Sequence, residues 1–426
     1  MQEKFFDVNK KKKRQIKNKL IKFIIIILCI IKYENQKNII ITDDTSFLKF
    51  IYQLNRNSNK YEKKNILLFD FIDSNVCEDT NAYLIFQYYQ KINNDNAYYV
   101  INEESDLYKS LVEQNKTKNI IPLKSNFDYM KLYPILLETK ILVQSYVLVT
   151  FQRIARMVKY LKFLYLCHAV NYFKLDTIKF ELVTLSEEKK NIIVTSPYEY
   201  NFYKKNNIYK EKAMHPGGLP RFDRLANLKK NESEKKCILI SFTFRSYNNT
   251  IYENSFYLKR LQELLSDENL LHFLEQNNID LIYIQHHFDV SRGRKINHSL
   301  FPKIKFETQN MLSKYIEKCS LYITDFSSVS FDFMFQNKPV LFYYLDIDDP
   351  FDFDEKDYMK KDNDNSIYYD NLFYDKENLV NKIKYIVNRN FQLDENLKDK
   401  YRNMFYNKNN ITEKIVNVIN NIINEK

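Results

Sequence analysis

Short apolar runs alternate with segments of helical spacing along most of this chain. In the first half the strand-like runs fall at residues 65–69, 97–101, 119–122, 140–149, 163–167 and 191–195. Helical patterns lie between several of them, at residues 80–92, 105–114 and 129–139. Continuous apolar strands separated by helices are what a parallel sheet covered on both faces requires.

The alternation stops at a polar stretch, residues 226–235, and then begins again. The second set of strand-like runs falls at 237–242, 279–285, 321–324 and 340–344, with helical patterns at 255–277, 311–318 and 331–336. Residues 346–374 have no period and are predicted to be a long loop, and the pattern is helical from 375 to the end. We therefore predict an α/β fold with two Rossmann-like, doubly wound domains facing a cleft. The predicted limits are a basic and apolar segment 1–35, domains 36–225 and 232–400, and a C-terminal helix 401–426.

The positive charge is concentrated at the N-terminus. The chain of 426 residues has a formal net charge of +11, and residues 1–22 hold nine Lys and Arg against Glu3 and Asp7. Nine apolar residues follow at 23–31, too few for a bilayer span of about 20 residues. No small-residue cleavage site of a signal peptide follows them. This pattern predicts peripheral attachment to an anionic membrane surface, at the cytoplasmic face. The alternative is a solvated basic arm that precedes a buried helix.

The composition argues against disulfides, a zinc site and a nucleic-acid partner. Five cysteines, odd in number and without CxxC spacing, indicate a reducing compartment and argue against a disulfide framework or a zinc site. A nucleic-acid-binding protein is expected to spread basic residues along one face. Here they gather at one end of the chain, so we predict no nucleic-acid partner. Only three glycines are present, and we expect Gly217 and Gly218 to occupy places where the backbone tolerates no side chain.

A hydroxyl-rich turn follows the predicted strand at 321–324. Asp325, Ser327 and Ser328 stand between this strand and an amphipathic helical pattern. Free backbone N–H groups, a helix dipole and two hydroxyl donors make an anion site in such a place. The alternative is that a serine only caps the helix, which is the usual reason for it.

Four further polar groups follow predicted strands, where ligands of doubly wound sheets bind. They are His168 with Lys174, Arg221 with Asp223, Arg245, and the pair His286–His287. Each also has a structural interpretation: a lone histidine is often structural, a Pro-Gly turn is a hinge, and surface arginines are common. Adjacent histidines suggest a metal site, but no Cys, Asp or Glu stands at suitable spacing, so we predict none.

Taken in order, these segments resemble the CDP-glycerol glycerophosphotransferase family, whose members prime and polymerise teichoic acids. The matching motifs are Cys167-His168-Ala169, Gly218-Leu-Pro-Arg-Phe-Asp223, Phe242-Thr-Phe-Arg245, Gln285-His-His287, Thr324-Asp-Phe-Ser-Ser328 with Asp332, and Asn337-Lys-Pro339. They span roughly residues 65–390. The chain departs from the family pattern at Ala169, where the family has Gly, and at Phe242, where it has Pro.

The resemblance implies a glycosyltransferase-B-like fold and a transferase that needs no cofactor. An acceptor hydroxyl on a lipid-linked glycan would attack the distal phosphorus of CDP-glycerol and release CMP. The implied catalytic residues are His168, as the base, and His287, chosen over His286 because a single aromatic residue follows it. The implied donor-phosphate residues are Arg245, Thr324, Asp325, Ser327 and Ser328. The implied substrate-binding residues are Lys174, Gly218, Pro220, Arg221, Asp223, Thr243 and Asp332.

Two alternatives stay open at this point. One is a transferase of the same architecture that uses a nucleotide sugar or CDP-ribitol for capsule or lipopolysaccharide. The other is an inactive scaffold at the membrane surface, suggested by Ala169 and Phe242. The sequence separates neither a primase from a polymerase nor one acceptor from another.

Overall fold

The computed structural model describes residues 44–70, 79–125, 128–146, 148–170, 189–228, 235–346, 371–406 and 408–425. The chain divides into two units, Met1–Arg56 and Asn57–Lys426. The described part of the first unit is helix α2 (Asp44–Asn57), and both sheets belong to the second unit. The predicted basic and apolar segment, 1–35, lies outside the described residues, and so does Lys174.

The first sheet of the second unit is parallel throughout. Within the described residues it has seven strands, in the order β3-β2-β1-β4-β5-β6-β7. The strands are β1 (Asn65–Phe69), β2 (Ala97–Asn102), β3 (Ile120–Leu123), β4 (Thr139–Gln144), β5 (Lys162–Tyr165), β6 (Lys190–Val194) and β7 (Met214–Pro216). Every residue of β1 is buried, as expected for a central strand with both faces covered. The order reverses between β1 and β4, which makes their carboxyl ends the expected ligand-binding edge.

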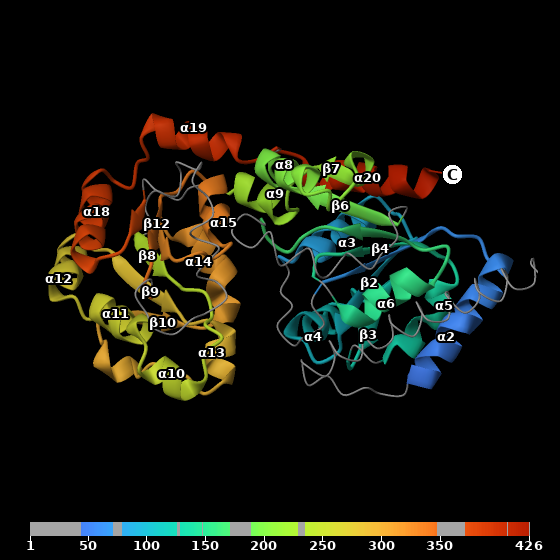
Figure 1. Cartoon of the computed structure of the whole chain (residues 1–426), viewed down its shortest axis with the longest axis horizontal. Helices are drawn as coiled ribbons and strands as arrows, with labels where there is room; N and C mark the ends of the chain where they lie inside the picture. Colours follow the sequence, from blue (N-terminus) through green and yellow to red (C-terminus); the bar gives the residue numbers. More distant parts are fainter. Residues whose placement is uncertain are drawn as a thin grey trace, which may run out of the picture. The chain divides into compact units, whose positions relative to one another are not determined.

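Helices between these strands cover the sheet (Figure 1). They are α3 (Asn81–Lys91), α4 (Asp106–Glu113), α5 (Tyr133–Leu136), α6 (Val149–Met157), α8 (Pro197–Lys205) and α9 (Arg221–Ala226). Short 3₁₀ turns lie at η1 (Ser58–Lys60), η2 (Asp128–Leu132) and η3 (Glu211–Ala213). Helix α6 packs on β1 through the rings of Phe69 and Phe151, whose centroids lie 4.2 Å apart.

The second sheet repeats the same winding. Within the described residues it has six parallel strands, in the order β10-β9-β8-β11-β12-β13. The strands are β8 (Cys237–Ile240), β9 (Asp280–Ile284), β10 (Lys305–Glu307), β11 (Leu321–Thr324), β12 (Val340–Tyr343) and β13 (Leu372–Phe373). Its order reverses between β8 and β11, so the loops after these two strands lie at the corresponding ligand-binding edge.

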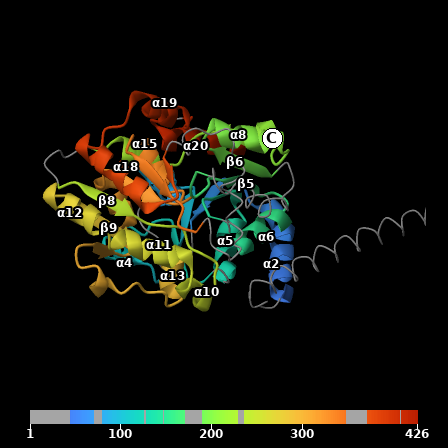
Figure 2. The ribbon, with the colours of Figure 1, turned by 60° about the vertical axis from the view of Figure 1, so that its left-hand side comes forward.

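The second sheet has its own helices, and the chain then returns to the first. The helices are α10 (Asn249–Glu253), α11 (Phe256–Leu265), α12 (Glu268–Gln276), α13 (His287–Ser291), α14 (Leu312–Lys318), α15 (Ser330–Phe335), α18 (Lys376–Asn388), α19 (Glu395–Asn403) and α20 (Ile411–Asn424), with 3₁₀ turns η4 (His298–Leu300) and η5 (Gln309–Met311). Helix α19 contacts α15, whereas α20 packs against α3 and β5 of the first sheet (Figures 1 and 2). Helix α9 contacts α15 through the stacked rings of Phe222 and Phe335, with centroids 4.3 Å apart.

The predicted fold class is confirmed: two parallel, doubly wound sheets follow one another along the chain. The predicted strand at 140–149 was too long, because β4 ends at Gln144 and α6 begins at Val149. The predictions did not include β7, β10 or α6, and β13 lies inside the predicted loop at 346–374. The rest of that loop lies outside the described residues, apart from Asp346 and 371–374. The predicted domain limits stay predictions.

Candidate active site

Asp70 organises the carboxyl edge of the first sheet. It follows β1 directly and is 2% exposed. Its carboxylate accepts hydrogen bonds from the backbone N–H groups of Ala82 and Tyr83 and from the Tyr99 hydroxyl, each at 3.0 Å, and from the Ser145 hydroxyl. Burial, and then the charge of Asp70, raise the pKa of Tyr99 well above its usual value, so the phenol keeps the proton that it donates. One buried carboxylate therefore ties the start of α3 to the ends of β1 and β4.

His168 lies just beyond β5 at the same edge. The residue before it, Cys167, has φ of +60°, a left-handed conformation that is uncommon for a residue with a side chain. Asn81 Nδ2 donates to the Cys167 carbonyl at 2.9 Å and holds this turn. The His168 side chain is exposed, and its ring centroid lies 5.1 Å from that of Tyr146. An imidazole is thus presented at the edge where the resemblance implied a base.

Arg221, the first residue of α9, connects the two sheet edges. Its Nη1 donates to the carbonyl oxygen of His168 at 2.5 Å. Its Nε and Nη2 donate to the two carboxylate oxygens of Asp332, at 2.6 and 2.9 Å. Asp332 is 1% exposed and belongs to α15, which follows the serine-rich turn of the second sheet. Both residues were predicted to bind substrate, but in this structure they bind one another.

The other predicted residues of this motif fix the C-terminal helix. Both carboxylate oxygens of Asp223 accept backbone N–H groups at the start of α20, from Ile411 at 2.8 Å and from Thr412 at 2.7 Å. A Cβ at Gly218 would come within 3.1 Å of the Ile411 Cδ1, so a side chain there would require the Ile411 side chain to shift. Pro220 is the residue before α9. The contacts of Asp223 hold the junction of α9 and α20. The substrate-binding role that the resemblance implied for Gly218, Pro220 and Asp223 stays a prediction.

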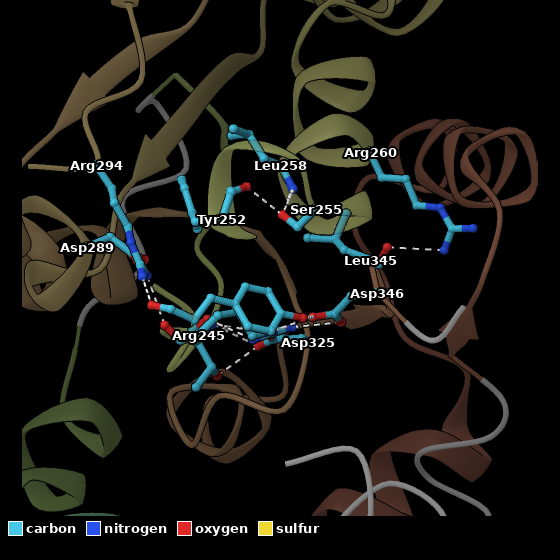
Figure 3. A network of polar contacts seen from close by, with 12 residues as sticks. Arg245, Tyr252, Ser255, Leu258, Arg260, Asp289, Arg294, Asp325, Leu345 and Asp346 are labelled. Carbon is cyan, nitrogen blue, oxygen red and sulfur yellow. Dashed lines mark hydrogen bonds and ion pairs between the residues drawn. The ribbon is translucent and has the colours of Figure 1, made fainter. Parts of the chain in front are cut away.

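In the second sheet, Arg245 lies at the centre of a buried ionic network (Figure 3). Its Nε and Nη2 donate to the carboxylate of Asp346 at 2.5 and 3.0 Å, and its Nη1 donates to Asp325 at 2.8 Å. Thr243 donates to Asp325 through its backbone N–H, at 3.0 Å, and through its hydroxyl, at 2.8 Å. The loop after β8 is therefore clamped to the ends of β11 and β12.

The burial of this network decides its role. Arg245, Asp325 and Asp346 are each 0% exposed, and the rings of Tyr257 and Phe326 lie 4.7 and 4.8 Å from the guanidinium carbon. Burial alone would lower the pKa of Arg245, but Asp346 and then Asp325 outweigh it and raise the pKa above the usual value. Because Arg245 and Asp325 are buried and bind each other, we propose that they position the loop. The phosphate contacts that the resemblance implied for them stay predictions.

The serine pair is the more accessible part of the turn after β11. Ser327 and Ser328 are partly exposed, whereas Thr324 is 0% exposed and donates its hydroxyl to the Ser241 carbonyl at 2.7 Å. The Ser327 carbonyl accepts the backbone N–H and the hydroxyl of Ser330, at 3.1 and 2.7 Å. Ser327 and Ser328 are thus more exposed than Thr324, and the phosphate contacts predicted for all three stay predictions.

The two adjacent histidines form an aromatic cluster beyond β9. His286 caps α13, because its Nδ1 accepts the backbone N–H of Phe288 at 3.2 Å. The ring centroid of His286 lies 4.6 Å from that of His287 and 5.9 Å from that of Phe244. Both histidines are partly exposed. Because His286 Nδ1 already accepts the capping hydrogen bond of α13, His287 remains our candidate for contact with the donor.

The described part of the chain contains neither a metal-binding cluster nor a membrane-spanning helix. No group of three or more His, Cys, Asp or Glu side chains in these residues is arranged to hold a metal ion. No described helix has the length and apolar character needed to cross a membrane.

The model of the family "CDP-Glycerol:Poly(glycerophosphate) glycerophosphotransferase" matches residues 50–421, most of the chain. The chain belongs to this family.

Two curated relatives, both from Bacillus subtilis (strain 168), are members of the teichoic acid pathway by name. The chain is similar to the minor teichoic acid biosynthesis protein GgaB, with 27% identity over 356 residues that cover 78% of this chain and 37% of GgaB. It is also similar to teichoic acid glycerol-phosphate primase, with 32% identity over 237 residues that cover 50% of this chain and 56% of the primase. The chain thus matches about a third to a half of the length of these relatives.

Solved structures support the fold. The wall teichoic acid polymerase TagF is similar with a TM-score of 0.59 at 15% identity, over 88% of this chain and 96% of that chain. The S. aureus MnaA–UDP structure is similar with a TM-score of 0.51 at 16% identity, over 85% and 99%. At such identities the likeness shows a shared glycosyltransferase-B-like fold.

Three residues that support the family's motifs were missed from the sequence: Asp70, Asn81 and Asp346. Asp70 and Asp346 share one recognisable signal, an acidic residue that directly follows a buried strand or its apolar extension. Asn81 has no such signal, because its partners at Cys167 and Arg221 are distant in sequence.

Proposed function

We propose that this glycerophosphotransferase family member transfers glycerol phosphate from CDP-glycerol to a hydroxyl of a lipid-linked glycan or growing polymer and releases CMP. Family membership supports the donor and the reaction class. The observation that carries the proposal is the Arg221 bridge. One guanidinium binds both the His168 carbonyl and the Asp332 carboxylate, so the exposed imidazole and the serine-rich turn belong to connected sheet edges.

In this reaction the acceptor oxygen forms a bond to the distal phosphorus of the donor. The bond from that phosphorus to the bridging oxygen breaks, and CMP leaves with the electron pair. His168 takes the proton of the acceptor hydroxyl. An imidazole suits this role because its unperturbed pKa is about 6.5, so that it can hold a proton briefly at neutral pH. Ser327 and Ser328 donate hydrogen bonds to the diphosphate, and His287 offsets the charge that grows on the leaving CMP.

The test is CMP release from CDP-glycerol by the 426-residue chain, with bacterial membranes that carry lipid-linked glycans as the acceptor source. His168→Ala should lower kcat by about 10²–10⁴-fold, the usual scale of general-base loss. The control is His272→Ala, which should keep the wild-type rate. His272 is an exposed residue of α12 that hydrogen-bonds to Gln276. An unchanged rate in His168→Ala removes that residue from the site. A panel with CDP-ribitol and nucleotide sugars identifies the donor.

We also propose that the protein works at the cytoplasmic face of a membrane, bound peripherally through residues 1–32. The support is the nine Lys and Arg of residues 1–22, followed by the apolar run at 23–31. A lipid-linked acceptor is presented at such a surface, so attachment there would raise its local concentration.

A further inference from the structure

The His168 turn is held from both sides by residues that are distant in sequence. Asn81 Nδ2 donates to the Cys167 carbonyl at 2.9 Å, and Asn81 Oδ1 accepts the backbone N–H of Arg221 at 3.4 Å. Arg221 Nη1 in turn donates to the carbonyl of His168 at 2.5 Å. Because Cys167 adopts a left-handed φ of +60°, this turn costs free energy and persists only where surrounding contacts hold it.

The Arg221 side chain suits this place for a geometric reason. Its guanidinium is a planar fork that donates in several directions at once. Here it makes a bidentate pair with Asp332 and a third bond, from Nη1, to His168. A lysine ammonium is a point charge on a flexible stem and does not reproduce this fork. Asp332 is itself buried, at 1% exposed, so the fork is anchored to the second sheet.

We propose that Arg221 is a positioning residue, through which the second sheet sets the orientation of His168. This inference rests on the proposed function, because it takes His168 as the base. Arg221 itself touches neither donor nor acceptor in this proposal. It fixes the backbone from which the imidazole projects, and Asp332 fixes Arg221. The second sheet thereby sets the backbone geometry of the base on the first.

The chain contains a matched control one turn further along α9. Arg224 forms ion pairs with Asp79, which precedes α3, and with Glu317 of α14. Arg224 therefore also links the first sheet's helices to those of the second, but neither of these ion pairs involves His168. If Arg221 acted only as a general link between the helices of the two sheets, loss of Arg224 should affect His168 as much as loss of Arg221.

The experiment combines kinetics with a readout that needs no activity. The chain has six histidines, and His168→Ala assigns the His168 signal in spectra of protein with ¹³C-labelled histidine rings. Arg221→Gln and Arg221→Lys should move the His168 signal and lower kcat by about 10²-fold, the scale of a misplacement of about 1 Å. The KM for CDP-glycerol should change by less than about 3-fold, because uniform donor binding is left intact. Arg224→Gln should leave the signal and kcat near the wild-type values.

Asp332→Asn weakens the same bridge by removing the charge of Arg221's partner. It replaces the Arg221 variants in the test if those do not fold. It should move the His168 signal in the same way. The inference is overturned if the Arg221 and Asp332 variants leave the His168 signal unchanged, or if Arg224→Gln moves it equally. A wild-type protein that releases no CMP from CDP-glycerol refutes the proposed function instead, and the spectra still decide whether Arg221 positions His168.

Discussion

Replacing Arg245 by methionine is the most direct way to separate a positioning role from a phosphate contact. Methionine keeps much of the side-chain volume but removes all guanidinium donors. Asp325 would keep the donors of Thr243, at 2.8–3.1 Å. Asp346 would keep the Tyr247 hydroxyl, at 3.4 Å, as its one remaining partner among the hydrogen bonds described here.

The expected cost follows from the burial of these groups. Asp325 and Asp346 are 0% exposed, so solvent does not screen the charges that Arg245 leaves behind. Removing one partner of a buried ion pair costs about 3–5 kcal/mol. For a domain of about 150–250 residues, this amount lowers Tm by roughly 6–20 °C. The variant Arg245→Met with Asp346→Asn should recover part of the loss, because the less satisfied charge is then removed.

Thermal unfolding followed by circular dichroism measures the loss of stability, and calorimetric titration with CDP-glycerol measures any loss of donor affinity. Arg260→Gln is the control, because Arg260 is partly exposed and donates to the neutral Leu345 carbonyl, at 3.1 Å, instead of to a buried carboxylate. It should cost only about 0.5–1.5 kcal/mol. If Arg245→Met instead leaves Tm within about 2 °C of wild type and weakens CDP-glycerol binding, Arg245 contacts the donor phosphate and our assignment is wrong.

Two further predictions concern the donor and the membrane. Ser327→Ala and Ser328→Ala should each weaken CDP-glycerol binding by about 10-fold or more, since a hydrogen bond to a charged group contributes about 1.5–3 kcal/mol. Calorimetric titration measures this, with exposed Ser299 as the control, and wild-type affinity in both variants would contradict the role of the turn. Deleting residues 1–32 should release the protein from phosphatidylglycerol vesicles in a flotation assay, since each Lys or Arg near such a surface contributes about 1 kcal/mol. Vesicle binding that persists after the deletion would contradict the membrane assignment.

The architecture could be predicted from the sequence because buried parallel strands leave continuous apolar runs. Strands β1 and β11 were predicted with their observed limits. The boundary after β4 was wrong for a physical reason. Leu148 and Val149 are apolar, and a short apolar run fits a buried strand as well as the start of a buried helix. The edge strand β10, which has three residues, offered too short a pattern.

The residues near the candidate site could be predicted, but several of their contact partners could not. Arg245 pairs with Asp325, 80 residues away, and with Asp346, 101 residues away. A sequence shows that an arginine follows a strand, but it does not show which carboxylates reach the same point in space. Arg221 and Asp223 illustrate the same limit, because the partners that use their polar atoms come from α15 and α20.

The structure also bears on the two departures from the family pattern that suggested an inactive scaffold. Phe242 is 3% exposed, and its ring meets that of Tyr257 edge-on, with centroids 6.3 Å apart. It thus adds to the apolar wall beside the Arg245 guanidinium. Ala169 is 4% exposed, so its methyl group is buried beside the exposed His168. Both departures are changes in buried packing next to the site, and neither removes a hydroxyl, imidazole or guanidinium that the proposed reaction uses. The composition of the site therefore favours an active transferase over a scaffold.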